Sequence, residues 1–461
     1  MAPSLERSEL FTPRADPADV VPAVERLGGP DWLRRRRSDA AQAAAEFPLP
    51  SVEAEEWRYS RIAELDLSRY GLREDLAPAD GPETEPAVTP DEVGELLADL
   101  GSLSGVVVLV DGRIVHSEVD GGVWDAGVRF GAAADDAVGG EVVLGSAMAE
   151  PVDLFALYND ALSEQPIALD VPRGVTVDHP FVVVSYLSTD TVAVLPRLSV
   201  RAGGNSQVSV MEVLLSADID ALAVPLTEIS VGTAARVSYA ALQDLGTRVW
   251  ELGSFVADVG RDATLSAGVA AIGGDYARLR LDCRLSGRGA TGNLSSVYFG
   301  DGDQMLDLRT YQEHAAADTT SNLLFKGGVS DRSHSVYTGL IRIRPDARGS
   351  NAFQTNRNLK LSDHAWAESV PNLEIENNDV HCSHASTVGP VDEDQRFYLE
   401  SRGVPTVVAE RLIVGGFFDE VLDSLAVPAL APAVSRRLDA MLDRNLGRVD
   451  VVDGSQDEAS S

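Results

Sequence analysis

The chain has 461 residues, 44% of them hydrophobic, and a formal net charge of −34. This composition supports a folded core, and its acidity argues against a general nucleic-acid-binding surface, because phosphate backbones repel a strongly acidic protein. No stretch approaches the roughly 18 apolar residues of a membrane-spanning helix, and the N-terminal sequence does not resemble a secretory signal, so we expect no membrane anchor.

Residues 1–174 are predicted to form a mixed helical and α/β region. Residues 31–47 are rich in helix formers, Asp31 is a plausible N-cap, and Pro48 ends the helix. Residues 75–95 are acidic and proline-rich, which predicts an exposed loop.

From about residue 175 the pattern changes to short strands with two-residue alternation. The clearest case is Leu279–Leu285, whose apolar face carries Cys283, so we expect this cysteine to be a small buried hydrophobe. The second cysteine is Cys382, and two cysteines imply no disulfide framework. A reducing cytoplasm is therefore the expected setting.

Glycines punctuate this part of the chain at nearly regular intervals, at positions 232, 246, 260, 274, 287 and 300. Each interval is roughly 13 or 14 residues, which is about the length of one strand and one turn. Two strands per coil then give a rung of roughly 27 or 28 residues. A fixed period is typical of a solenoid, so we predict a parallel β-helix over residues 175–388. An antiparallel sandwich is the alternative, because it also spaces strands regularly.

Helical patterns return in residues 389–450, and the polar tail 451–461 is expected to be disordered. The predicted fold is thus mainly β: a right-handed parallel β-helix between an N-terminal helical and α+β region and a C-terminal helical domain. One C-terminal helix carries more apolar surface than a short terminal helix needs. These residues form either the domain's own core or a docking face for a partner, and the sequence does not separate the two: Leu412, Phe417, Phe418 and Val421.

The candidate chemistry lies in "DVHCSHASTVG", residues 379–389. Alternation along a strand places Cys382 and His384 on one face and His381 on the other. Thiolate and imidazole bind zinc, iron or a sulfide-bearing cluster, but two ligands do not close a site. The sequence has no CxxC, P-loop, GxSxG or HExxH motif, so either the fold or another chain supplies the remaining ligands.

Four stretches carry a resemblance to a known family: "EEWRYS" at 55–60, "TYQEH" at 310–314, "LLFKGGVSDRSHSVYTGLI" at 323–341, and residues 371–403 around the Cys-Ser-His motif. They resemble the SufB/SufD family of iron–sulfur cluster assembly proteins, and most of all its SufD branch. The motifs fall in family order, and the dense match covers about a quarter of the chain.

The resemblance implies a non-enzymatic assembly subunit. Its β-helix would pair with the SufB paralogue, its C-terminal helices would dock the SufC ATPase, and a transient iron–sulfur cluster would form at the SufB–SufD interface. On this sequence the interface histidine is His384, with Cys382 as its neighbour, and the two would be metal ligands shared with the SufB chain. The missing ligands would then belong to another chain.

Other residues are accessory candidates. His381 and His314 are further histidines of the same region, and Glu374 and Glu376 are placed to attract iron, although both glutamates also fit ordinary solvated strand edges. A flavin has been linked to the family's complex, but the sequence shows no flavin motif. Unpaired β-helix edges make a homodimer plausible when the partner is absent.

Three alternatives compete with this interpretation. A SufB-like scaffold is disfavoured, because residues 351–362 ("NAFQTNRNLKLS") lack the scaffold cysteine that SufB carries there, and "CSHA" replaces SufB's "EHEA". A carbohydrate-active β-helix enzyme normally has a secretory signal and a groove of clustered Asp, Arg or Lys. Here the N-terminal sequence does not resemble such a signal, and the candidate ligands are His and Cys. A purely structural solenoid needs neither the histidine-rich end nor the helical domain.

Overall fold

The computed structural model describes residues 20–72, 89–148 and 150–446. The predicted tail 451–461 and most of the predicted loop 75–95 lie outside the described residues. Within that loop, however, residues 91–95 begin a helix. Asp91 and Glu92 lie in its first turn, where acidic side chains stabilise the positive end of the helix dipole.

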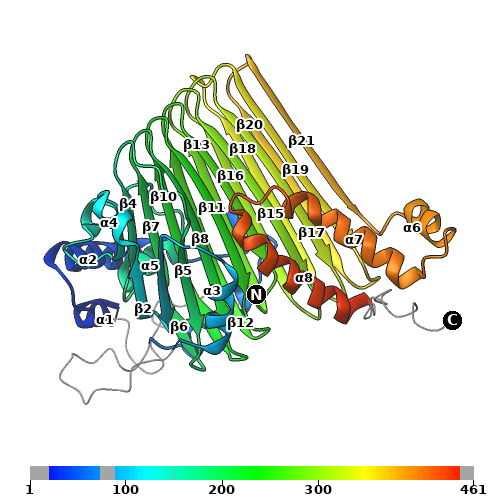
Figure 1. The fold of residues 1–461 in the computed structure, drawn as a ribbon, viewed down its shortest axis with the longest axis horizontal. Helices are drawn as coiled ribbons and strands as arrows, with labels where there is room; N and C mark the ends of the chain where they lie inside the picture. The colour runs from blue at the N-terminus through cyan, green and yellow to red at the C-terminus, as the bar shows by residue number, and fades with distance from the viewer. Residues whose placement is uncertain (1–19, 73–88, 149, 447–461) are drawn as a thin grey trace, which may run out of the picture.

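Two long sheets form the body of the molecule (Figure 1). The ten-stranded sheet contains, in spatial order, β2 (Arg113–Val119), β1 (Gly105–Val110), β5 (Phe181–Leu187), β8 (Gln207–Ser216), β11 (Arg236–Asp244), β13 (Thr264–Ala271), β15 (Thr291–Gly300), β17 (Thr320–Val329), β19 (Ser350–Lys360) and β21 (Val380–Gly389). The eleven-stranded sheet contains, in spatial order, β20 (Trp366–Ile375), β18 (His334–Ile343), β16 (Met305–His314), β14 (Tyr276–Leu285), β12 (Val249–Val259), β10 (Leu226–Val231), β7 (Arg197–Ala202), β4 (Ile167–Val171) and β3 (Arg129–Ala132). In addition, β9 (Ala221–Ala223) pairs with β12, and β6 (Val192–Val194) pairs with β9.

Successive turns of the chain stack in parallel within each sheet. Arg236 pairs with Thr264, one predicted rung further along the chain, whereas His334 pairs with Trp366, which lies beyond the length of one predicted rung. The predicted period therefore holds in the middle of the solenoid, and the rungs lengthen toward its C-terminal end. The parallel β-helix is confirmed, and the antiparallel sandwich is wrong.

The parallel stacking begins before residue 175, where the sequence placed its start. β4 pairs in parallel with β7, and β1 pairs in parallel with β5, which follows it only after more than two predicted rungs of chain (Gly105 with Phe181). The glycine period does not reach these strands. Helices and further strands separate β1 from β5, and the rung that joins β4 to β7 precedes the first glycine of the regular series.

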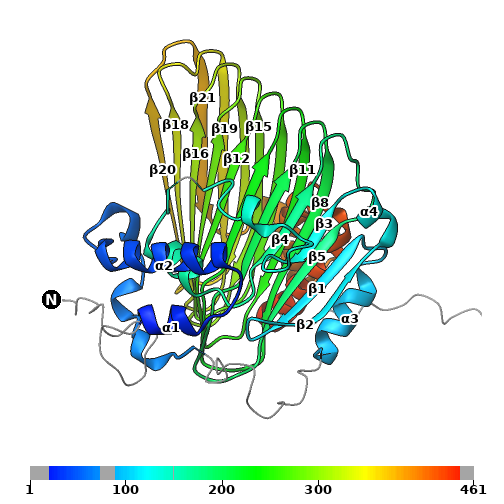
Figure 2. The ribbon, with the colours of Figure 1, turned by 90° about the vertical axis from the view of Figure 1, so that its left-hand side faces the viewer.

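Helices cover the outer faces of both sheets (Figure 2). Those on the eleven-stranded sheet are α1 (Val20–Arg26), α2 (Asp31–Glu46) and α5 (Leu154–Leu162), and those on the ten-stranded sheet are α3 (Asp91–Asp99), α7 (Thr406–Leu422) and α8 (Ala431–Leu446). Two further helices are α4 (Gly121–Asp125) and α6 (Glu393–Glu400). The N-cap of α2 is Pro30, so Asp31 lies in the first turn and is not the cap that the sequence predicted.

Alternate residues of each strand point into the lumen between the two sheets and form the main core there. Cys283 is one of them, with 2% of its surface exposed, so its predicted role as a buried hydrophobe is confirmed. Burial raises the pKa of its thiol to about 12. Among the described helices, none combines the length and apolar character needed to cross a bilayer.

Candidate functional site

The Cys-Ser-His motif lies on β21, the last strand of the ten-stranded sheet. Within the described chain β21 pairs in the sheet with β19 alone, and β20 closes the other sheet in the same way, with β18 as its neighbour. The C-terminal end of the solenoid therefore presents two strand edges and an uncovered lumen. Figure 1 shows β20 and β21 together at this end.

The register identifies the face on which each motif residue lies. Cys382 pairs with Ala352 and His384 with Gln354, and both β19 partners are buried inward-facing residues. Cys382 and His384 thus belong to the inward row, as alternation predicts. His381 lies on the opposite, exposed face.

Cys382 and His384 differ in their surroundings. Cys382 is half-buried against a small apolar cluster that includes Ile341 and Ile343, and burial raises the pKa of its thiol. A nearby metal ion or cation would be needed to favour the thiolate. His384 is exposed, because no further rung of the described chain covers the inward row above it.

The accessory candidates do not join this pair. His314 is fully buried in the lumen, where Nδ1 hydrogen-bonds to Thr319 Oγ1 (2.8 Å) and Nε2 to Ser321 Oγ (2.9 Å). Burial lowers its pKa to about 4, so it stays neutral. Glu374 and Glu376 form ion pairs with Arg342 at 3.3 and 3.4 Å.

Among the described residues, no three His, Cys, Asp or Glu side chains lie close enough together to hold a metal ion. Cys382 and His384 therefore supply two ligands at most. A closed metal site at this end needs further ligands from outside the described residues.

Large apolar side chains surround the same end. They are Phe353, Trp366, Leu373, Ile375 and Val388, whose exposed fractions lie between 36% and 58%. Three of them, Leu373, Ile375 and Val388, occupy inward positions of the terminal strands, where a further rung would cover them. Exposed apolar side chains beside unpaired strand edges are typical of a protein–protein interface.

The C-terminal helices divide the four predicted docking residues into two groups. Phe418 and Val421 are buried against the ten-stranded sheet, so they belong to the chain's own core and are not available to a partner. Leu412 is 57% exposed, and Phe417 is partly buried.

Sequence reasoning missed the exposed aromatics of α6, which projects beyond the sheet in Figure 1. Phe397 and Tyr398 are 70% and 55% exposed. The signal was present in the adjacent aromatic pair of "QRFYLE", but its exposure depends on where α6 lies relative to the solenoid.

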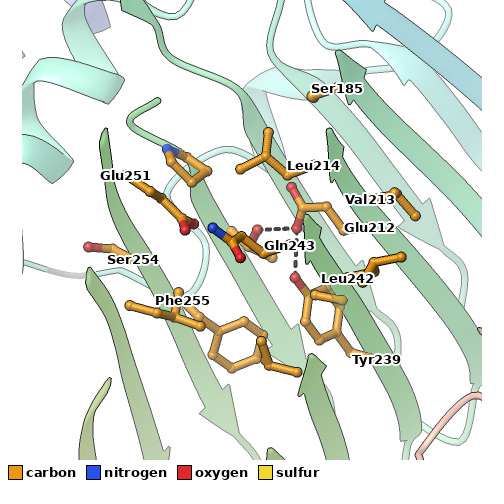
Figure 3. Close-up of a pocket in the computed structure, with 15 residues that line it drawn as sticks. Ser185, Glu212, Val213, Leu214, Tyr239, Leu242, Gln243, Glu251, Ser254 and Phe255 are labelled. Atoms are coloured by element: carbon orange, nitrogen blue, oxygen red, sulfur yellow. Dashed lines mark hydrogen bonds between the residues drawn. The ribbon is translucent and has the colours of Figure 1, made fainter. Parts of the chain in front are cut away.

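A separate polar cluster lies inside the lumen, in the middle of the solenoid (Figure 3). The hydroxyls of Thr227 and Tyr239 both donate to Glu212 Oε2, at 2.5 and 2.7 Å. Burial raises the pKa of Glu212. Burial also raises the pKa of Glu251 to about 8, and a hydrogen bond from Gln243 to Glu251 offsets only part of this second shift. The cluster borders a cavity of about 50 Å³ whose lining contains no Lys, Arg or His.

The family of the chain follows from a comparison with family models. The model described as "SUF system FeS cluster assembly, SufBD core domain" matches residues 185–417, half of the chain, which contain most of the solenoid and the Cys-Ser-His motif. The chain belongs to the SufB/SufD family of iron–sulfur cluster assembly proteins.

Individual relatives agree with this assignment. An iron–sulfur cluster assembly SufBD family protein of Mycobacterium tuberculosis is 39% identical over 227 residues, which are 48% of this chain and 56% of that protein. The SufD protein of Bacillus subtilis is 27% identical over 90% of this chain and 94% of its own length. The SufD protein of Escherichia coli is 33% identical over 38% of this chain and 42% of its own length. The predicted resemblance to SufD is confirmed.

The structure explains why several SufB/SufD-like motifs contain the residues they do. In "EEWRYS", Trp57 is buried beneath the Arg278 guanidinium, whose carbon lies 3.8 Å from the ring centre. In "FKGGVS", Lys326 donates to the carbonyl of Phe417 on α7 at 2.6 Å. A Cβ atom on Gly328 would lie 2.7 Å from Phe299, so glycine lets the strand pack closely beneath α7. These motifs fasten the N-terminal segment and α7 to the solenoid.

Proposed function

We propose that the chain is a non-catalytic, cytoplasmic subunit of an iron–sulfur cluster assembly complex. It pairs with a SufB-like paralogue through the open C-terminal end of its β-helix and docks a SufC-like ATPase through its C-terminal helices. His384, with Cys382 beside it, faces the transient cluster, which is the complex's product and is shared with the SufB-like chain.

The observation that carries this proposal is the incomplete ligand pair at an uncovered interface. Cys382 and His384 lie on the inward row of the last strand, next to unpaired edges and exposed apolar side chains. Imidazole and thiolate are ligands that iron accepts, and the partner's end of the lumen would supply the rest.

For the ATPase, the exposed surface of α6 and α7 is the favoured docking site. Phe397, Tyr398, Val407 and Leu412 are all exposed there, whereas Phe418 and Val421 hold α7 on the solenoid. This division supports a rigid attachment on one side of α7 and a free apolar surface on the other side.

The first test is the native mass of the tagged chain co-expressed with the SufB-like and SufC-like proteins of its source. Size exclusion with light scattering is expected to give a species that contains this chain, one SufB-like chain and the ATPase. A chain that stays alone or only self-associates, with both partners soluble, contradicts the proposal.

The second test compares two histidines of the same strand in that complex. His384→Ala is expected to lower the iron and sulfide content of the purified complex at least several-fold. His381→Ala is the matched control, because His381 lies on the opposite face, and it should leave both contents unchanged. Equal loss in the two variants contradicts a specific role for His384.

A further inference from the structure

The lumen becomes polar beneath the terminal strands. Toward the C-terminal end its inward row includes Thr310, Gln312, Gln354, Asn356 and Asn358, all buried. Most of these side chains satisfy one another: Thr310 bonds to the Tyr337 hydroxyl, and Asn358 donates to Asn356, each at 2.8 Å.

Two buried amides in this row are exceptions. Gln312 and Gln354 are each 2% exposed, and neither the nitrogen nor the oxygen of either amide has a hydrogen-bond partner among the described residues. A buried amide without partners destabilises the folded chain, so we expect each amide to gain a hydrogen bond that this arrangement of the side chains does not show.

Only Gln354 lies next to the Cys-Ser-His motif. It pairs in register with His384 on the neighbouring strand, which is about 4.8 Å away in a parallel sheet. Both side chains belong to the inward row. Gln312 lies on β16 in the other sheet, in register with Cys283 and Ile341.

The fold leaves room for the Gln354 amide. A Cβ atom on Gly339, across the lumen, would lie 2.2 Å from Gln354 Nε2 and 2.5 Å from the Tyr337 hydroxyl. Any side chain at position 339 would therefore displace the amide. Glycine keeps the amide within the lumen, directly beneath His384.

We propose that Gln354 is a positioning residue for His384: its amide oxygen accepts a hydrogen bond from Nδ1–H of the imidazole. That bond fixes the tautomer in which Nε2 carries no proton and is free to bind iron. Metal-binding histidines commonly donate their other ring N–H to a carbonyl or carboxylate, which orients the ring and raises its basicity. The structure shows no such bond, so the exposed His384 side chain has to rotate toward the amide to form it. The inference deepens the proposed function and rests on it for the role of iron, but this rotation needs neither metal nor partner.

The test uses the full chain alone, labelled with ¹⁵N-histidine, at a pH where His384 is neutral. His384→Gln identifies its signals, and long-range ¹H–¹⁵N correlations report its tautomer. The Nδ1–H form is expected to predominate in the unmodified chain. Gln354→Met keeps the side-chain length but removes the acceptor, and should convert that majority into a mixture. Gln354→Glu keeps an acceptor oxygen, so the Nδ1–H tautomer should again predominate in that variant.

Gln312→Met is the matched control, because Gln312 is equally buried and equally unpartnered but does not neighbour His384. It should leave the tautomer unchanged. A tautomer unaffected by Gln354→Met, an equal change in both variants, or no Nδ1–H preference in the unmodified chain overturns the inference. Because no metal or partner is present, these results are independent of whether the assembly complex forms.

Discussion

The middle of the solenoid and its C-terminal end are built from the same kind of strand and turn, but they differ in the burial of their inward side chains. In the middle, inward side chains such as Phe255, Leu281 and Phe325 are buried by the rungs on both sides. At the end, Leu373 and Val388 occupy equivalent inward positions but remain exposed, because the described part of the chain has no further rung. Because each rung buries its faces only against its neighbours, inner rungs are well packed, whereas an uncapped terminal rung exposes apolar surface that can bind another protein. The difference favours the C-terminal end as the place where the proposed partner binds, without reference to the Cys-Ser-His motif.

The largest expected effect is a difference in the free energy of unfolding between a substitution in the core of the solenoid and one at its C-terminal end. Phe325 is fully buried, with its ring 5.3 Å from that of Tyr337, so Phe325→Ala should lower the free energy of unfolding by about 3–5 kcal/mol. Leu373→Ala, at the uncovered end, should cost less than about 1 kcal/mol in the isolated chain. Denaturant titration measures both. Similar losses in the two variants would show that the end is packed like the middle.

The pH dependence of stability tests the lumen cluster in the middle. The Glu251 carboxyl ionises near pH 4.5 when unfolded and near pH 8 when folded. Between these values the folded chain keeps a proton that the unfolded chain releases, so the free energy of unfolding falls as pH rises, by an amount on the order of a few kcal/mol. Glu251→Gln should flatten this decline. An unchanged slope in that variant would place the titration elsewhere.

A smaller effect concerns the attachment of the C-terminal helices. Lys326 is 3% exposed and donates to the Phe417 carbonyl and to Glu420, so Lys326→Met should cost about 1–3 kcal/mol. Hydrogen exchange should become faster in α7 and not in β21. Lys360→Met is the control, because Lys360 is partly exposed and bonds to the Asp363 carbonyl nearby. Equal effects of the two substitutions would remove the special role of Lys326.

The smallest effect on stability is expected at the motif itself. His384 is exposed and has no packed neighbours above it, so His384→Ala should change the free energy of unfolding by less than about 0.5 kcal/mol. A residue kept for an interface is expected to matter to the complex and not to the fold. A large loss of stability in the isolated chain would indicate a structural histidine.

The parts that the sequence predicts are those with a local signal. Regular glycines predict the parallel rungs, alternation predicts a buried Cys283, and the helical pattern of residues 389–450 predicts the C-terminal helices. The start of the solenoid was misplaced because β1 pairs with a strand far along the chain and because the regular glycines begin only after the rung that joins β4 to β7. The pairing of Gln354 with His384 was not predicted, because the rungs lengthen toward the C-terminal end and the glycine period does not give the exact register there. The burial of Phe418 and Val421 depends on how α7 docks, which no helical pattern contains.

The central proposal is that a SufB-like partner binds the open C-terminal end of the β-helix. Hydrogen exchange of the backbone amides tests it most directly, measured for the chain alone and in the co-purified complex with its SufB-like and SufC-like partners. The proposal predicts strong slowing of exchange in β20 and β21, whose outer edges have no strand partner among the described residues, and little change in β11 to β14 at the middle of the solenoid. Unchanged exchange in β20 and β21 within a verified complex would contradict it, because the partner would then bind elsewhere.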